Sequence, residues 1–301
     1  MEFGLHLPHV GPFANREAVL GMARAADAAG IDSLWVSDHV VVPRDYPSRY
    51  PYAPSGKMPL PDDAPFLEAV ATLLAVSGVT ERARLGTSVL VLPQRQAVLV
   101  AKQWATLDVL SGGRTIFGVG VGWLAEEFAA LGVPFASRGS RCDEALRLIE
   151  RCWVEDSVSF KGRQFGEHFQ VERLACEPKP LQKPRPPIWI GGHTQAALRR
   201  VARYGDAWHA NGTAELCGSG MATIRAEAES NGRDPATIGL TIRDGKLLDV
   251  STREAREKTI ERLLPYVAVG ASHFVFLALS PPEAIPDVVG ALNQEVKPSL
   301  S

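Results

Sequence analysis

The chain has 301 residues, of which 46% are hydrophobic and 22% charged, and its formal net charge is −2. This length suits either one α/β barrel or two smaller domains. The nearly balanced charge gives no reason to expect nucleic acid or an anionic membrane as a partner. No apolar run approaches the roughly 20 residues of a membrane span, and the N-terminal residues do not read as a secretory signal. The four cysteines lack CxxC spacing, so we expect free thiols in a reducing cytoplasm, not a zinc site or disulfides.

Short apolar strands alternate with helices along the whole chain. The first strand is expected at Glu2–Leu7, and Asn15 is the expected N-cap of a helix that ends at Gly30. Further strands are predicted at Ser33–Ser37, Arg84–Leu92, Thr115–Val119, Ile188–Ile190, Ala207–Ala210, Leu240–Arg243 and Phe274–Leu279. Helices are predicted at Phe66–Val79, Gln96–Leu110, Ala125–Leu131, Arg141–Val154, Thr194–Tyr204, Met221–Ser230, Arg253–Leu264 and Pro282–Asn293.

Two segments interrupt this alternation. Residues 43–65 are dense in proline and tyrosine and too long for an ordinary connection, which predicts a lid-like loop facing the substrate. Residues 156–187 read as a hairpin followed by a proline-rich run, which we interpret as an insertion into one βα unit. About eight strand–helix units remain, and they favour a closed (β/α)8 TIM barrel over an open doubly wound sheet. No composition shift marks a boundary, so residues 1–301 are expected to form one domain.

Glycines follow the most uniformly apolar strand. Thr115–Val119 has no polar alternation, as expected for a strand buried on both faces, and Gly118, Gly120 and Gly122 lie at its end. Such glycines allow a flat ligand to approach the backbone, or they allow tight packing of neighbouring elements. The run is not a dinucleotide fingerprint, because Trp123 stands where glycine or alanine is required.

Polar residues collect at the predicted strand ends. In a parallel barrel all carboxyl ends lie on one face, where active sites occur. The residues placed there are His6, His9, Asp38, His39, Thr87, Ser88, Gly191, Gly192, His193, Thr194, His209 and Asn211. Gly191–Thr194 opens a helix whose free N–H groups could bind phosphate, although a plain strand-to-helix turn explains the motif equally well. The number of histidines on one rim favours a ligand site.

The spacing of the first two histidines argues against a metal-dependent hydrolase of this fold. Paired metal ligands on one strand need even spacing to face the same way. His6 and His9 are three residues apart and are expected on opposite faces. We therefore predict no metal site.

Four longer segments, SLWVSDH, LGTSVLVLP, AKQWATLDVLSGGRTIFGVGVGW and PIWIGG, resemble the luciferase-like monooxygenase superfamily. The resemblance covers nearly the whole chain and is greatest to the branch that uses the deazaflavin coenzyme F-420 (8-hydroxy-5-deazaflavin). It implies a barrel that binds F-420, or FMN as the alternative, at its C-terminal rim, and a homodimer. It also implies a non-prolyl cis peptide at Ser88–Val89 that forms a bulge behind the cofactor ring.

The resemblance also implies roles for individual residues. His39 is the expected general acid or base, and Asp38 either orients it or caps the following loop. The expected cofactor-binding residues are Ser88, Val89, Gly120, Gly122, Gly191, Gly192, His193, Thr194 and Asn211. The expected substrate residues are Trp123, Tyr50 and His9, with Tyr46 and Tyr52 as further candidates. Two departures weaken specific activities: Trp123 replaces an acidic residue of sugar-phosphate dehydrogenases, and Val121 replaces the phosphate-binding arginine of bacterial luciferase.

These observations predict a flavin- or deazaflavin-dependent oxidoreductase that transfers a hydride or activates oxygen on a small organic substrate. Two alternatives remain: a hydrolase or lyase on the same barrel with no redox cofactor, and a non-catalytic flavin-binding relative. The sequence does not identify the substrate, and it leaves the use of oxygen open.

Overall fold

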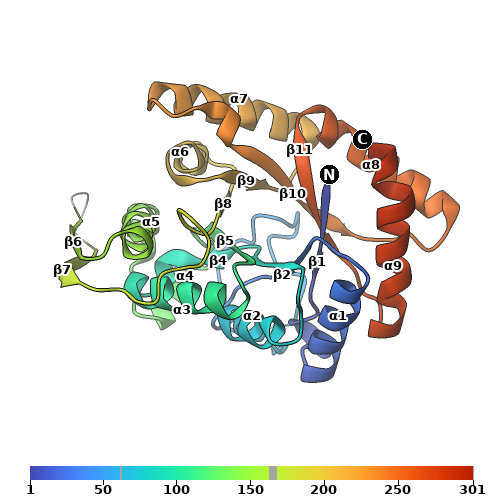
Figure 1. Cartoon of the computed structure of the whole chain (residues 1–301), viewed down its shortest axis with the longest axis horizontal. Coiled ribbons are helices and arrows are strands. Elements are labelled where there is room, and N and C mark those ends of the chain that lie inside the picture. The colour runs from blue at the N-terminus through green and yellow to red at the C-terminus, as the bar shows by residue number, and fades with distance from the viewer. Residues whose placement is uncertain (62, 163–167, 301) are drawn as a thin grey trace.

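The strands form a closed parallel barrel surrounded by helices. The computed structural model describes residues 1–61, 63–162 and 168–300. The strand order is β3-β2-β1-β11-β10-β9-β8-β5, and β3 pairs with β5 to close the circle. Figure 1 shows the helices arranged as a ring around these strands, with the two termini close together. The predicted (β/α)8 barrel is confirmed.

The elements lie close to their predicted positions. The strands are β1 (Glu2–His6), β2 (Ser33–Val36), β3 (Arg84–Thr87), β4 (Leu90–Val91), β5 (Thr115–Gly120), β6 (Val158–Lys161), β7 (Gln170–Leu174), β8 (Ile188–Gly191), β9 (Ala207–Ala210), β10 (Gly239–Leu247) and β11 (Ala271–Leu277). The α-helices are α1 (Arg16–Ala28), α2 (Ala69–Ser77), α3 (Ala97–Leu110), α4 (Ala125–Ala130), α5 (Arg138–Val154), α6 (Gln195–Tyr204), α7 (Ala214–Ser230), α8 (Arg253–Ala268) and α9 (Ile285–Ala291). Short 3-10 or π turns occupy Gly11–Phe13, Leu92–Gln94, Phe135–Ser137, Pro235–Thr237, Pro282–Ala284, Leu292–Val296 and Pro298–Leu300.

The third strand is divided in two. A cis peptide joins Ser88 to Val89, as the resemblance implied, and it separates β3 from β4. After this break β4 pairs with the far end of β5, with Leu90 opposite Val119. The prediction of one continuous strand from Arg84 to Leu92 is therefore wrong, whereas the predicted bulge is confirmed.

The largest boundary error concerns α7, which begins at Ala214 and not at Met221. Thr213 caps this helix, because its side chain accepts a hydrogen bond from Leu216 N–H. The glycines in its first turns read as helix breakers, but Gly220 has a packing function. A Cβ on Gly220 would lie 2.3 Å from the ring of Trp208, so only glycine fits against this buried side chain.

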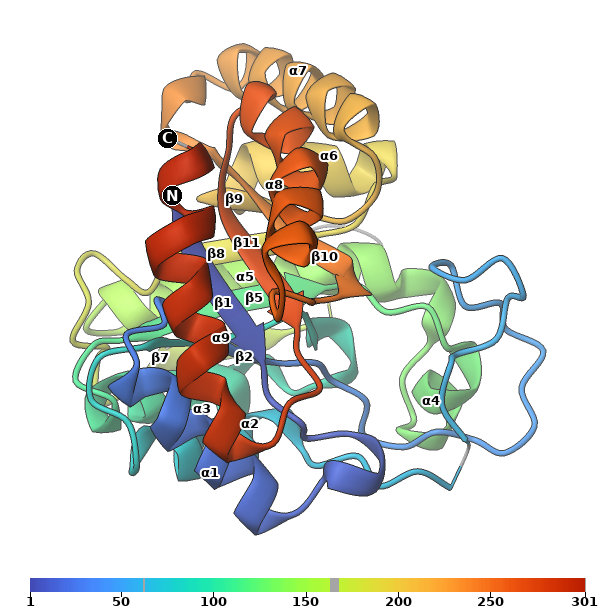
Figure 2. The ribbon, with the colours of Figure 1, turned by 90° about the vertical axis from the view of Figure 1, so that its right-hand side faces the viewer.

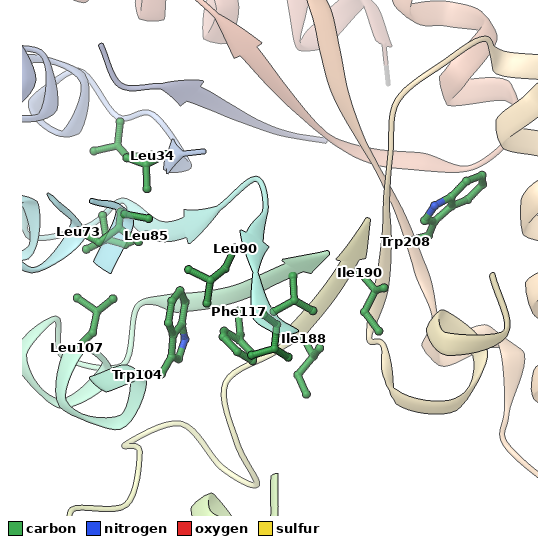
Figure 3. Packing of buried hydrophobic residues seen from close by; sticks show 14 of the residues in the cluster. Leu34, Leu73, Leu85, Leu90, Trp104, Leu107, Phe117, Ile188, Ile190 and Trp208 are labelled. Atoms are coloured by element: carbon green, nitrogen blue, oxygen red, sulfur yellow. The ribbon is translucent and has the colours of Figure 1, made fainter. Parts of the chain in front are cut away.

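Most of the apolar core lies between the strands and the surrounding helices. Trp104 of α3 packs on Phe117 of β5 with their ring centroids 4.7 Å apart, and both side chains are fully buried. Figure 3 shows this layer continuing from Leu34 past Ile188 to Trp208. Every residue of β5 is buried, which explains its uninterrupted apolar sequence.

The barrel interior has a second, smaller core built on Trp35. Its indole stacks on Trp189 with the ring centroids 5.0 Å apart. Glycines on the neighbouring strands make room for this ring, because a Cβ on Gly4 or on Gly86 would lie 2.4 Å from it. The interior is therefore filled by side chains, and a ligand has to bind at an end of the barrel.

Two segments lie outside the regular alternation of strands and helices. β6 and β7 pair as an antiparallel hairpin on the outside of the ring, and their connection at 163–167 lies outside the described residues. The 43–65 loop lies beside α4 (Figure 2). Among the described helices, none has the length and apolar character needed to cross a membrane.

Candidate functional site

The floor of the candidate site is formed by a buried histidine at the carboxyl end of β9. His209 Nε2 lies 2.8 Å from Ser88 Oγ, and its Nδ1 lies 2.8 Å from Thr241 Oγ1. Its ring stacks on Trp35 at an interplanar angle of 11°. Burial, together with the positive charge of Arg243, lowers the pKa of His209 to about 3. His209 is therefore neutral at physiological pH and joins three strands through hydrogen bonds.

His39 is paired with a carboxylate that the sequence analysis did not identify. Its Nδ1 lies 2.8 Å from Glu127 Oε2, and Glu127 is almost fully buried in the first turn of α4. The other carboxylate oxygen, Oε1, accepts hydrogen bonds from the backbone N–H groups of Val40 (2.6 Å) and Val41 (3.3 Å). Glu127 therefore holds both the imidazole and the chain that follows it.

Asp38 has a different function from the orienting role considered for it. Its carboxylate pairs with Arg95 (2.7 Å) and accepts a hydrogen bond from the backbone N–H of Val91 (2.9 Å). It neither orients His39 nor caps the loop after β2. Asp38 instead fixes β4, the segment that follows the cis peptide, against the end of β2.

The prediction that His6 and His9 face opposite ways is wrong. Their rings stack with the centroids 6.4 Å apart, because β1 ends at His6 and period-2 alternation does not extend to His9. His9 Nδ1 donates to Leu7 O, and its Nε2 accepts from the backbone N–H of Ser37. Both nitrogens of His9, a candidate substrate residue, are thus used within the protein. Nε2 of the buried His6, in contrast, has no partner within the described ranges.

The glycines at the ends of β5 and β8 make room for side chains of the segment that follows the cis peptide. A Cβ on Gly120 would lie 2.6 Å from Val89 Cγ2, and one on Gly191 would lie 3.2 Å from Val89 Cγ1. A Cβ on Gly122 would lie 2.6 Å from Val91 Cγ1. The tight-packing explanation for Gly120 and Gly122 is therefore correct, and the side chain of Val89 occupies the space that these glycines leave.

The predicted phosphate motif at the start of α6 has the expected backbone geometry. Gly192 has a φ of +110°, and Thr194 is the N-cap whose hydroxyl accepts from Ala197 N–H. The N–H groups of Gln195 and Ala196 have no partner within the helix by α-helical geometry. His193 Nε2 lies 2.6 Å from Asn211 Oδ1, while its Nδ1 is buried without a partner in the described part of the chain. The two predicted cofactor residues His193 and Asn211 are thus in contact.

Aromatic side chains of the 43–65 loop gather around Trp123. Its ring lies 5.7 Å from that of Tyr46, 5.2 Å from that of Tyr50 and 5.8 Å from that of His39. Tyr52 continues this contact network from Tyr50 to His193. The loop therefore connects the end of β5 with the end of β8, over the face where His39 lies.

Sequence reasoning missed two charged residues of this face, Glu127 and Arg243. Glu127 follows the glycine run in the first turn of a helix, where an acidic residue reads as ordinary helix capping. Arg243 follows Thr241 by two residues on β10, and this spacing alone was a signal that both face the barrel interior.

Unpartnered nitrogen atoms leave this face able to bind a polar ligand. His6 Nε2, His193 Nδ1 and Arg243 Nε are buried and have no hydrogen-bond partner among the residues that the structure describes. A flavin or deazaflavin carries ring carbonyls, ring nitrogens and a phosphate that can satisfy such groups, so the residues present fit this kind of cofactor. Within the described part of the chain, no three His, Cys, Asp or Glu side chains form a group that could hold a metal ion.

The fold and this site define a parallel (β/α)8 barrel with a histidine–carboxylate pair at the C-terminal ends of its strands, the face on which enzymes of this fold act. The model of the luciferase-like monooxygenase family matches residues 1–290. The chain belongs to this family.

Relatives in this family use two kinds of cofactor. An uncharacterized protein of Mycobacterium tuberculosis is 36% identical over 230 residues, which cover 76% of this chain and 77% of the relative. An F420-dependent glucose-6-phosphate dehydrogenase of Amycolatopsis mediterranei is 29% identical over 84% of this chain and 66% of its own length. An FMNH(2)-dependent dimethylsulfone monooxygenase of Pseudomonas putida is 34% identical over 55% of this chain and 45% of its own length.

Solved structures share the fold at low sequence identity. A monooxygenase from Streptomyces bottropensis has a TM-score of 0.74 and 19% identity, with 100% of both chains covered. An F420-dependent secondary alcohol dehydrogenase has a TM-score of 0.76 and 18% identity, covering 100% of this chain and 99% of the other. At these identities the likeness establishes the fold alone.

Proposed function

We propose that the protein is an oxidoreductase that uses coenzyme F-420, with FMN as the alternative, to act on a small organic substrate. The observation that carries this proposal is the His39–Glu127 pair at the C-terminal end of a luciferase-like barrel. The F-420 assignment is supported by the dehydrogenase of Amycolatopsis mediterranei, which aligns over more of the chain than the FMNH(2)-dependent monooxygenase.

The hydrogen bonds of His39 determine which nitrogen can move a proton. An ionised carboxylate only accepts, so the proton of the Nδ1–H···Oε2 bond lies on His39. Nε2 of this ring has no hydrogen-bond partner among the residues that the structure describes. In the neutral ring Nε2 accepts a proton from a substrate hydroxyl or amine, and in the imidazolium it donates one.

Two regions of the rim would hold the cofactor. His193 and the start of α6 offer N–H groups and an open ring nitrogen, and Val89 offers an apolar surface. A bound flavin or deazaflavin supplies the hydride chemistry that protein side chains lack. Trp123 and the 43–65 loop would exclude water from the face on which His39 lies.

Titration with purified F-420 and with FMN, followed by absorbance and fluorescence, tests the cofactor. We expect saturable binding of F-420 at least tenfold tighter than that of FMN. Stoichiometric FMN without measurable F-420 affinity would refute the deazaflavin assignment but keep the flavin-dependent function. No binding of either cofactor would favour the alternative of a hydrolase or lyase, and binding without turnover would favour a non-catalytic relative. The homodimer and the cytoplasmic location remain predictions; light scattering of the purified protein tests the homodimer.

A further inference from the structure

Arg243 faces the barrel interior at the carboxyl end of β10. Thr241, two residues earlier, hydrogen-bonds the buried His209, so that face of β10 points inward. Arg243 pairs in register with Val275 of β11, which packs on Trp35 in the interior core. Residues paired in register on adjacent strands share a face of the sheet, so Arg243 lies above this core, at the end of the barrel where His39 lies.

Arg243 has no counter-charge. Within the described ranges it forms no hydrogen bond or ion pair, and its Nε is buried without a partner. Three other buried or half-buried arginines each have a carboxylate partner: Arg95 pairs with Asp38, Arg185 with Asp206 and Arg200 with Asp143. The neighbouring Asp244 is paired with Arg262 and not with Arg243. A half-buried guanidinium without an anion is costly, which indicates that a ligand supplies the missing charge.

The histidines around Arg243 are neutral, and one of them, His6, can donate a hydrogen bond to a ligand. Burial and the charge of Arg243 together lower the pKa of His6, His9 and His209. These histidines are therefore uncharged at neutral pH. They do not balance the negative charge of a bound anion, which leaves that to Arg243. His6 is 5% exposed, and its unpartnered Nε2 can donate to a ligand oxygen.

We propose that Arg243 and His6 form an anion subsite on the floor of the barrel mouth, and that the substrate is a small organic anion bearing a carboxylate, phosphate or sulfonate. The planar guanidinium would hold two oxygens of this group in a forked pair of charge-assisted hydrogen bonds. This inference rests on the proposed function, because it names the substrate class of that same site. The cofactor's phosphate has the same chemistry, so the experiment separates the two sources.

The first arm titrates the full-length protein with benzoate and with inorganic phosphate at constant ionic strength. Binding is followed by the imidazole NMR signals of His6, assigned with a His6→Asn variant. We expect saturable binding to the wild type that is at least tenfold weaker in Arg243→Met. Arg243→Lys keeps the positive charge but loses the forked pair of hydrogen bonds, so it should retain part of the affinity. If Arg243→Met does not fold, the affinity of Arg243→Lys tests the proposal. Lys246→Met removes one charge from an exposed position of the same strand and should bind like the wild type.

The proposal is wrong if neither anion binds saturably to the wild type, or if Arg243→Met and Arg243→Lys both bind as tightly as the wild type.

The second arm measures the affinity of the same variants for FMN, for F-420 and for riboflavin, which lacks the phosphate. We expect unchanged cofactor affinities. If Arg243→Met weakens FMN and F-420 but not riboflavin, the anion is the cofactor's phosphate and the substrate assignment is overturned. If no cofactor binds at all, the proposed function fails, and the first arm still decides whether the anion subsite exists.

Discussion

His39 can exchange protons only through Nε2, because Glu127 occupies Nδ1. Burial raises the pKa of Glu127, but hydrogen bonds from His39 and from the Val40 backbone outweigh it and hold the pKa below its usual range. Glu127 is therefore ionised at neutral pH and fixes both the tautomer and the direction of the His39 ring. The carboxylate of Asp38, the residue before His39, is instead paired with Arg95 and accepts a hydrogen bond from the backbone of β4.

The first prediction concerns the loss of the His39 imidazole. If Nε2 moves a proton in the rate-limiting step, His39→Ala should lower turnover by roughly 10²–10⁴-fold while leaving cofactor affinity nearly unchanged. His39→Gln, which keeps a hydrogen-bonding side chain, should be equally slow, and the pH–rate profile should lose one limb in both variants. Turnover is followed by the absorbance change of the cofactor.

A matched control and a contradicting outcome accompany this test. His168→Ala removes a histidine that bonds to Ser140 near the β6–β7 hairpin, and it should leave turnover unchanged. Equal loss of cofactor affinity in His39→Ala and His39→Gln would make His39 a binding residue. The proton-transfer role would then pass to His193, whose Nδ1 has no partner among the described residues.

At the scale of elements, the 43–65 loop is attached to α4 through one serine. Ser48 Oγ accepts a hydrogen bond from Ala125 N–H (3.1 Å), and Ser48 N–H donates to Glu126 Oε1 (3.2 Å). The same helix carries Glu127, which holds His39. The 43–65 loop and His39 are therefore both bonded to α4, so the position of α4 determines the positions of both.

Ser48→Ala should loosen this loop without affecting the barrel. Losing the hydrogen bond to Ala125 costs about 1 kcal/mol locally, equivalent to roughly fivefold more opening. Trypsin should accordingly cut at the exposed Arg44 and Arg49 about fivefold faster, while the free energy of unfolding in urea stays near the wild-type value. Ser219→Ala on α7 should leave the cleavage rate unchanged. Wild-type cleavage in Ser48→Ala would mean that the aromatic contacts with Trp123 hold the loop by themselves.

At the scale of the whole molecule, the barrel interior contains histidines that are neutral in the folded state at neutral pH. The pKa of His209 is about 3 in the fold, against an ordinary value of 6.5. At pH values between these two pKa values, His209 is protonated in the unfolded chain but not in the folded chain. The free energy of unfolding therefore falls as the pH is lowered from 6.5 and levels off below about 3. Burial lowers the pKa of His6, His9 and His273 as well, so they act in the same direction.

Stability should accordingly decrease between pH 7.5 and pH 5. His209 alone should contribute about 2 kcal/mol over this range, from roughly 1.4 kcal/mol per pH unit below 6.5. Urea denaturation at both pH values measures the difference, in a range where carboxylates contribute little. His209→Gln should reduce the difference by about this amount. If the free energy of unfolding depended on pH equally in the wild type and in His209→Gln, the lowered pKa of His209 would be contradicted.

The sequence by itself determined the barrel and the face that carries the site. Strands such as Thr115–Gly120 are buried on both faces, and this leaves an uninterrupted apolar signature that alternates with helices. Local hydrogen bonding also made the caps at Asn15 and Thr194 predictable, because both partners lie within one turn. The cis bond at Ser88–Val89 followed from a family motif, and the position of His39 followed from the end of β2.

The tertiary structure decided which residues are partners. Glu127 is 88 positions from His39, and Asp38, its neighbour, is committed to Arg95. Gly120 and Gly191 are small because Val89 comes from a different strand and packs across both. Beyond a strand end the period-2 alternation no longer gives a side chain's direction, so the contact of His6 with His9 was mispredicted. Such pairings depend on distances between segments far apart in the chain, which only the closed barrel sets.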